Sequence, residues 1–244
     1  MQVDLSDNTK LLKTFSIEFE PNFSLNLSQQ NNTQNHGTTV WDSAKLLAFY
    51  LFESIKKPKF EVDQGEVVVK NQKKCLELGS GCGLGGLLMA SLGFDTVLTD
   101  LPEVLDRVLL NNCDTAIQDI QQWWYHLHHT EHASVKPKIE VRSLDWLNLP
   151  ILETEEFHYI LASDCIYEIQ LVEPLLKCIR AYSSSKTITF IAMERRDDVV
   201  VNGFIEKARL YGFDARMILK KIIQNHQHLV CNEDVEIWKL KLRG

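Results

Sequence analysis

The residues best suited to chemistry in this chain lie in one glycine-rich segment, Cys75–Gly83, which has glycines at 79, 81 and 83. An apolar run ends at an acidic residue, the glycines follow at alternate positions, and a second apolar run begins at Leu84. Because glycine adopts positive φ and has no Cβ, a ligand can approach such a backbone closely. The free N–H groups at a helix start favour a carboxylate or a phosphate. The segment therefore predicts a strand, a tight turn and a helix that hold a nucleotide-like ligand.

The register of these glycines separates two classes of nucleotide site. Residues 81–86 fit the dinucleotide pattern G-x-G-x-x-G literally. In a dinucleotide site the first glycine directly follows the strand, whereas here the turn already begins at Gly79. The order Glu-x-Gly-x-Gly-x-Gly, which starts at Glu77, resembles motif I of S-adenosylmethionine-dependent methyltransferases. A plain chain reversal is the alternative to both classes of site.

A second acidic residue stands where a ribose site requires one. Residues 94–99 form a short apolar run that ends at Asp100. In βαβ nucleotide folds, an acid about 20 residues beyond the first glycine bonds the ribose hydroxyls. Asp100 could instead cap a helix opening at Leu101, since aspartate is a favoured N-cap and Pro102 suits the first turn. We expect the ribose role, and both roles can hold at once.

The composition is that of an ordinary globular protein. The 244 residues are 45% hydrophobic and 24% charged, with a formal net charge of −7, which suits one large α/β domain or two small ones. We expect no membrane segment, because no apolar run approaches ~20 residues and the first ten residues lack a signal-peptide core. Nucleic-acid binding is disfavoured, because no basic face stands out. Six cysteines without a C-x-x-C pair suggest reduced core thiols in a cytoplasmic or also nuclear protein.

The hydrophobic pattern predicts strands that alternate with helices. Alternation over 14–20 and 24–28 predicts a β-hairpin, helical spacing predicts a helix over about 40–55, and residues 56–73 are expected to be a connector. Further strands are expected at 73–78, 94–99, 138–143, 157–163 and 186–193, with helices at 83–92, 102–112, about 114–132, 168–181 and 198–211. Two last strands, about 213–221 and 234–242, are expected to pair antiparallel.

This order of elements predicts an α/β fold with a doubly wound, Rossmann-like, mostly parallel sheet that has an antiparallel C-terminal hairpin strand. We expect residues 1–37 to be an N-terminal extension with the β-hairpin, and residues 38–244 to be the main domain. Ligands of such sheets bind at the carboxyl ends of the strands where the strand order reverses, between the first and fourth strands. Asp164 and Tyr167 follow the fourth strand, so they should face the same crevice as the glycine turn.

Five short blocks then identify a family. Val40–Ala44, Glu77–Gly81, Thr99–Leu101, Leu144–Trp146 and Ser163–Tyr167 follow one another in a fixed order. Together they resemble the seven-β-strand protein lysine methyltransferases of methyltransferase family 16, and most of all the branch that holds the valosin-containing-protein lysine methyltransferase. The resemblance covers about residue 14 to the end. It implies that residues 38–244 form a methyltransferase domain, that S-adenosyl-L-methionine is the cofactor, and that the acceptor is the ε-amine of a lysine in a protein substrate.

The resemblance also implies roles for individual residues. The cofactor-binding residues would be Trp41, Glu77, Gly79, Ser80, Gly81, Asp100, Trp146 and Ser163. Among them, Trp41 would close over the cofactor, Asp100 would hold the ribose and Trp146 would lie against the adenine. Asp164 and Tyr167 match the family's D-x-x-Y motif at the methyl-transfer site and are the expected catalytic residues.

An amine acceptor suits the residues between Asp164 and Tyr167. Methyltransferases that act on amide or base nitrogens often have two prolines at these positions, where this chain has Cys165 and Ile166. A lysine must first lose a proton, and a free pKa of ~10.4 makes this cost about 4.6 kcal/mol at neutral pH. Desolvation and the nearby sulfonium both lower that pKa. Asp164 would favour the charged amine, so its expected role is orientation and recognition.

Other functions stay open from the residues alone. The chain could methylate a small molecule or a nucleic acid, or could be a non-catalytic protein-binding module that retains the fold; a short-chain oxidoreductase is a more distant possibility. No metal site is expected, because His128 and His132 lack the H-E-x-x-H pattern and a nearby cysteine. Glu194-Arg195 resembles a charged segment near the family's substrate mouth, and residues 114–136 form a longer insertion than the resemblance implies. A monomer is expected, because a one-domain site needs no partner.

Overall fold

A seven-stranded sheet forms the centre of the molecule in the computed structural model, which describes residues 3–4, 9–30, 37–63, 66–128, 136–149, 155–219, 229–230 and 234–243. The strand order is β11-β13-β10-β9-β6-β7-β8. The strands are β6 (Lys74–Leu78), β7 (Asp95–Asp100), β8 (Ile139–Ser143), β9 (Tyr159–Ser163), β10 (Ile188–Glu194), β11 (Phe213–Met217) and β13 (Val235–Leu242). Strands β6 to β10 pair in parallel, and β13 pairs antiparallel with both β10 and β11. The predicted fold class is confirmed.

The strand order reverses beside the first strand of the sheet. The chain runs outward from β6 through β7 to β8, and then returns to place β9 against the other side of β6. The carboxyl ends of β6 and β9 therefore flank the reversal, as predicted, and a crevice at this point is where such sheets bind ligands.

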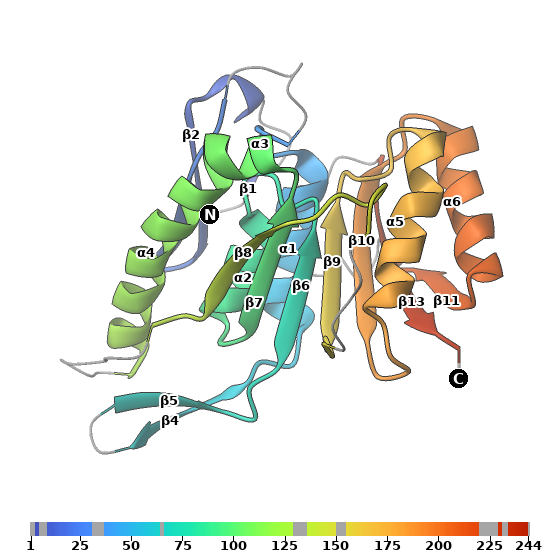
Figure 1. Cartoon of the computed structure of the whole chain (residues 1–244). Coiled ribbons are helices and arrows are strands. Elements are labelled where there is room, and N and C mark those ends of the chain that lie inside the picture. Colours follow the sequence, from blue (N-terminus) through green and yellow to red (C-terminus); the bar gives the residue numbers. More distant parts are fainter. Residues whose placement is uncertain are drawn as a thin grey trace.

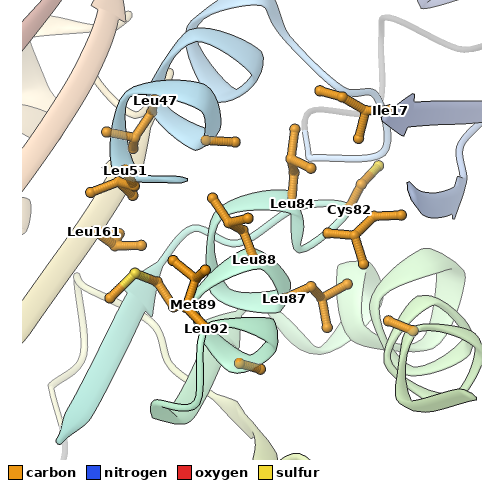
Figure 2. Packing of buried hydrophobic residues seen from close by; sticks show 14 of the residues in the cluster. Ile17, Leu47, Leu51, Cys82, Leu84, Leu87, Leu88, Met89, Leu92 and Leu161 are labelled. Carbon is orange, nitrogen blue, oxygen red and sulfur yellow. The ribbon is translucent and has the colours of Figure 1, made fainter. Parts of the chain in front are cut away.

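Helices cover both faces of the sheet because its strands are apolar on both sides. The helices are α1 (Asp42–Ser54), α2 (Leu84–Ser91), α3 (Pro102–Val104), α4 (Leu110–His128), α5 (Ile169–Ala181) and α6 (Asp198–Leu210). Within β9, Leu161 packs with α1 and α2, whereas its neighbours Ile160 and Ala162 pack with α5 and α6, as the two-residue period of a strand requires. Figure 1 shows α5 and α6 side by side on one face, and Figure 2 shows Leu47, Leu88 and Leu161 converging from α1, α2 and β9.

The expected break between two helices near residue 113 is wrong. Helix α3 continues through a π-helical turn (Leu105–Leu109) directly into α4, and residues 103–128 contain no glycine or proline that could stop it. The aromatic residues near its end are core residues: Trp123 stacks on Phe23 at 4.1 Å between ring centroids, and the Trp124 indole N–H donates to the Ser91 carbonyl at 2.7 Å.

Among the described residues, two hairpins and a few short elements lie outside the main sheet. The predicted hairpin is confirmed as β2 (Thr14–Glu20) with β3 (Phe23–Ser28). The expected connector 56–73 contains a second antiparallel hairpin, β4 (Lys59–Asp63) with β5 (Glu66–Lys70), which sequence reasoning missed. Figure 1 shows this hairpin at the end of the sheet where β6 begins, away from the carboxyl ends. The remaining elements are η1 (Thr9–Leu11) and the pair β1 (Val3–Asp4) and β12 (Leu229–Val230).

Within the described ranges no helix has both the length and the hydropathy of a membrane span. The five cysteines that can be described, at positions 75, 82, 113, 165 and 178, are buried free thiols. The same described ranges hold no cluster of three histidine, cysteine or acidic side chains that could bind a metal ion. His132, one of the two histidines considered above, lies outside the described residues.

Candidate active site

The glycine turn after β6 is held in a shape that only glycine adopts easily. Gly79 and Gly81 have φ values of 60° and 55°, in the left-handed region that costs other residues free energy. A Cβ on Gly79 would lie 2.7 Å from the Cys165 sulfur, and a Cβ on Gly81 would lie 2.8 Å from the Gly37 carbonyl oxygen. Neither position has room for a side chain, so the bare backbone of the turn is open to close approach by a ligand.

Ser80 and Asp100 fasten this turn to the end of β7. The Ser80 N–H donates to the Thr99 carbonyl at 2.9 Å, and the Ser80 hydroxyl accepts from the Thr99 N–H at 3.0 Å. One Asp100 carboxylate oxygen accepts from the Gly81 N–H and the other from the Leu101 N–H, both at 2.8 Å. Helix α3 begins after Leu101 without a side-chain cap, so the alternative N-cap role of Asp100 is wrong.

Burial and hydrogen bonding have opposite effects on the pKa of Asp100. Burial raises the pKa of the Asp100 carboxyl above its ordinary value, and the two backbone N–H donors of Gly81 and Leu101 lower it. A carboxylate fixed in this way at the end of the second strand can accept hydrogen bonds from neighbouring hydroxyls.

Trp146 is positioned by a turn that follows β8. The Leu144 N–H donates to the Asp100 carbonyl at 2.9 Å, which ties this turn to the end of β7. The Asp145 carboxylate accepts from the Leu147 N–H at 2.9 Å, and so closes a short loop around Trp146. The indole edge of Trp146 lies 3.0 Å from the position of a Cβ on Gly79. The aromatic ring and the glycine turn are therefore direct neighbours.

One cavity of about 510 Å³ lies at the reversal of the strand order. Every residue that the sequence predicted for the site lines this cavity, with the exception of Glu77. The lining residues among them are Trp41, Gly79, Ser80, Gly81, Asp100, Trp146, Ser163, Asp164 and Tyr167. They come from the start of α1 and from the ends of β6, β7, β8 and β9, which the topology brings together. The glycine turn and the Asp164–Tyr167 segment thus share one cavity, as the strand order predicts; the roles of these residues toward a ligand stay predictions.

Glu77 stands apart from the other predicted residues. Its carboxylate lies behind the turn, against the start of α2, where Gly85 and Gly86 leave room for it. This packing explains why glycine stands at both positions, of which Gly86 is the last glycine of the literal dinucleotide pattern. Glu77 is 2% exposed, and burial raises its pKa to about 7, against the opposing effect of the Gly86 N–H. A direct contact between Glu77 and a cofactor stays a prediction.

The buried acid gives a stability prediction. The native carboxyl of Glu77 keeps its proton up to about pH 7, whereas the ordinary value is 4.5. The folded state therefore binds more protons than the unfolded state in this window, and the free energy of unfolding falls as the pH rises through it. A pKa change of this size corresponds to about 3 kcal/mol.

Glu77→Gln removes the titrating group, so we expect most of this loss to disappear. Denaturant unfolding of both proteins at about pH 5 and about pH 8 measures the difference. Equal losses in the wild type and the variant would show that another group carries the dependence.

Asp164 is a buried carboxylate on a strained backbone. It follows β9 with φ 53°, and its N–H donates to the Ala192 carbonyl at 2.9 Å. Its side chain is 6% exposed, and its carboxylate accepts from the Arg196 guanidinium at 2.8 Å. Burial raises the pKa of Asp164, and the adjacent Arg196 charge opposes this shift. Helix α5 begins later, after Glu168, so Asp164 does not cap this helix.

Tyr167 stands at the rim of the cavity. It lies three residues after Asp164 and is 38% exposed, so its ring reaches both the cavity and the solvent. Burial of the remainder raises the pKa of its phenol, which keeps the hydroxyl protonated near neutral pH. A protonated phenol can donate one hydrogen bond and accept others.

The charged residues after β10 differ from the sequence expectation. Arg195, predicted at the mouth with Glu194, is absent from the cavity lining and pairs with Glu236 at 2.7 Å and Asp198 at 2.8 Å. The next residue, Arg196, lines the cavity instead. Sequence reasoning missed it, although the alternation of side chains along extended backbone offered a signal that two successive arginines point to different sides.

Other lining residues were given no individual role in the sequence analysis, although Leu101, Leu144 and Asp145 lie within its five blocks. Charged side chains flank the aromatic and glycine region, and apolar side chains complete the wall; these residues are Glu103, Arg107, Asp145, Leu101, Leu144, Leu147 and Leu171. With these residues the cavity has a mostly apolar wall and a few charged groups, which is typical of small-molecule sites.

The spacing of the glycines, the acids Glu77 and Asp100 at two strand ends, and the shared cavity together point to one family. A family model confirms this family. A model described as lysine methyltransferase matches residues 20–209. The chain belongs to this family. It is 26% identical to the protein-lysine methyltransferase METTL21E of Bos taurus, in an alignment that covers 86% of this chain and 67% of that protein. It is 30% identical to the protein-lysine N-methyltransferase rrg1 of Schizosaccharomyces pombe, over 74% of this chain and 54% of that protein.

A third relative aligns over most of both lengths: the protein N-lysine methyltransferase METTL21A of Mus musculus is 27% identical over 96% of this chain and 89% of that protein. The alignments with the first two relatives span only about half to two thirds of their lengths. The assignment to the branch of the valosin-containing-protein enzyme stays a prediction.

Solved structures support the fold. A TehB-like SAM-dependent methyltransferase from Corynebacterium glutamicum matches with a TM-score of 0.52 and 17% identity, over 85% of this chain and 90% of that one. The glycopeptide N-methyltransferase MtfA in complex with S-adenosyl-L-homocysteine also matches with a TM-score of 0.52, at 9% identity, over 82% of this chain and 87% of that one. At this level of identity the similarity shows the shared Rossmann-like architecture.

Proposed function

We propose that this protein transfers a methyl group from S-adenosyl-L-methionine to the ε-amine of a lysine in a protein substrate. The observation that carries the proposal is the single cavity that joins the Gly79–Gly81 turn to Asp164 and Tyr167. Membership of the lysine methyltransferase family supports it, as do the printed activities of the relatives, which are protein-lysine methyltransferases.

The cofactor fits the half of the cavity around the glycine turn. Its methionine part would lie on the Gly79–Gly81 backbone, its ribose hydroxyls would donate to Asp100, and its adenine would lie against Trp146. A volume of about 510 Å³ is in the usual range for a site of this kind. When bound, S-adenosyl-L-methionine supplies an electrophilic methyl group on a positively charged sulfur.

The other half of the cavity suits the acceptor amine. Asp164 and Tyr167 would orient the lysine nitrogen toward the methyl carbon, and orientation within about 3–3.5 Å in line supplies much of the rate enhancement. A new N–C bond forms as the C–S bond breaks, and the amine must already have released its proton to water. Cys165 and Ile166 are buried, and the Cys165 thiol is directed to the backbone carbonyls of Leu78 and Ser163, so Asp164 and Tyr167 are the polar side chains that this segment offers to the amine.

We also propose that the protein acts as a monomer in the cytoplasm, and that the nucleus is a second compartment consistent with the same chemistry. The buried free thiols of the described cysteines suit a reducing compartment. The glycine turn, Asp100 and the Asp164–Tyr167 segment all belong to one domain, which supports the monomer.

The proposal is tested by following the label from S-adenosylmethionine with a radioactive methyl group. We expect the purified protein, incubated with a cell extract, to place the label in a protein band. Label in the nucleic-acid or small-molecule fraction would favour the alternative acceptors. Cofactor binding without label in any fraction would favour a non-catalytic binding module.

A further inference from the structure

The acceptor half of the cavity contains a complete cation-binding arrangement. An aromatic face and a buried carboxylate are the two groups that proteins most often use to bind an ammonium ion. Trp41, just before α1, and Asp164, just after β9, supply them at one cavity. The ring that the family resemblance places over the cofactor thus also borders the acceptor half. The Asp164 side chain is only 6% exposed, so its charge is directed into the cavity and its surroundings rather than into bulk solvent.

A cation of the protein itself already occupies this arrangement. The Arg196 guanidinium carbon lies 4.9 Å from the centre of the Trp41 ring, and its Nη2 atom donates to the Asp164 carboxylate at 2.8 Å. Both groups that would recognise a substrate ammonium are therefore in contact with one arginine. A lysine that enters the cavity meets a competitor of the same charge.

Arg196 can leave these contacts without losing every partner. Its Nε and Nη2 atoms also donate to the Glu194 carboxylate, at 2.8 and 2.6 Å. Glu194 ends β10, two residues before Arg196, so this second ion pair is local and can persist while the guanidinium moves outward. The Arg196 side chain is 40% exposed, so it borders solvent and has room to move outward.

We propose that Arg196 is an internal occupant of the substrate-ammonium subsite, and that the incoming lysine displaces it from Asp164 and Trp41. This proposal rests on the lysine methyl-transfer function proposed above. Arg196 thereby lowers the affinity of the subsite for any amine, because the amine must displace a tethered guanidinium. A lysine on a protein offsets this loss through further contacts at the rim, which a free amine lacks. The subsite favours amines presented by a macromolecule over free ones.

The neighbouring arginine provides a matched control. Arg195 makes its contacts with Glu236, Asp198 and Asn202, away from the cavity lining. Arg195→Gln and Arg196→Gln therefore remove the same charge from adjacent positions, and only the second frees Asp164 and the part of the Trp41 ring that Arg196 contacts. Lys10 Nζ, which lies 4.7 Å from the centre of the same ring, stays in all three proteins. Thermal melting and the binding of S-adenosylhomocysteine show whether each variant keeps its fold and its cofactor half.

The experiment titrates n-butylammonium, which reproduces the end of a lysine side chain, into the full chain saturated with S-adenosylhomocysteine. Calorimetry at about pH 8 keeps the ammonium charged and carboxylates ionised. We expect Arg196→Gln to bind n-butylammonium about tenfold more tightly than the wild type, a difference of about 1.4 kcal/mol, and Arg195→Gln to match the wild type.

Equal or weaker binding by Arg196→Gln, or no binding by any of the three proteins, would overturn the proposal. Loss of packing cannot produce tighter binding, so the expected result separates occupancy from a structural role. The readout uses no methyl transfer, so failure of the proposed function would appear separately, as a lack of labelled protein in an enzyme that still binds n-butylammonium.

Discussion

Asp164→Asn is expected to lower kcat/KM for methyl transfer by about 100-fold or more, the scale on which misplacement of a reacting group acts. The variant keeps the size of the side chain and suits the backbone, because asparagine tolerates the positive φ of 53° found at this position. It removes the negative charge that would orient the acceptor amine. Label transfer to a protein substrate at several substrate concentrations gives kcat/KM.

Asp197→Asn is the matched control for this prediction. Asp197 is the N-cap of α6, where its carboxylate accepts from the Val199 N–H at 2.8 Å, and asparagine caps a helix as well as aspartate does. The control should keep its activity, and both variants should bind S-adenosylmethionine with wild-type affinity. Unchanged kcat/KM in Asp164→Asn would remove this residue from the transfer step.

Gly79→Ala is expected to weaken S-adenosylmethionine binding by about 100-fold or more. The added Cβ would lie 2.7 Å from the Cys165 sulfur and 3.0 Å from the Trp146 ring, on a backbone with φ 60°. The strain of a left-handed alanine is about 1–2 kcal/mol, and relief of the clash must move the turn or the two side chains that border the cofactor half of the cavity. Isothermal titration of the purified variant measures the dissociation constant.

A second glycine shows what the substitution costs away from the site. Gly203 lies inside α6, and a Cβ there would meet only the terminal carbon of Ile169, at 2.9 Å. Since this flexible side chain is 43% exposed and can move, Gly203→Ala should gain about 0.5–1 kcal/mol of stability from helix propensity and bind the cofactor normally. Wild-type affinity in Gly79→Ala would contradict the placement of the cofactor on the turn.

The parts of the fold that follow from periodicity could be predicted from the sequence. The alternation of apolar strands with amphipathic helices gave the parallel sheet, and the pairing of β6 with β9 follows from the usual order of such sheets. This pairing alone brings Asp164 beside the glycine turn, although 85 residues separate it from Gly79 in the chain. The candidate site was therefore accessible from topology and from motifs at strand ends.

The parts that were missed depend on features that periodicity does not report. The β4–β5 hairpin lies in a segment whose lysines, proline and glycine suggested a connector, although Val67, Val68 and Val69 favour a strand. The junction of α3 and α4 was misplaced because a π-helical turn absorbs the change in register without a helix-breaking residue. Arg196 was missed because its partners, Trp41 and Asp164, are distant in sequence.

Mass spectrometry after incubation with deuterated-methyl S-adenosylmethionine tests the central claim most directly. The claim is that the cavity between Gly79 and Tyr167 joins a methyl donor to a lysine amine. Native extract treated with the wild-type protein should contain peptides with deuterated methyl groups on lysine, and extract treated with Asp164→Asn should lack them. Deuterated methyl groups found instead on glutamine, arginine, nucleic acid or a metabolite, and lost in the same variant, would contradict the assignment of the acceptor.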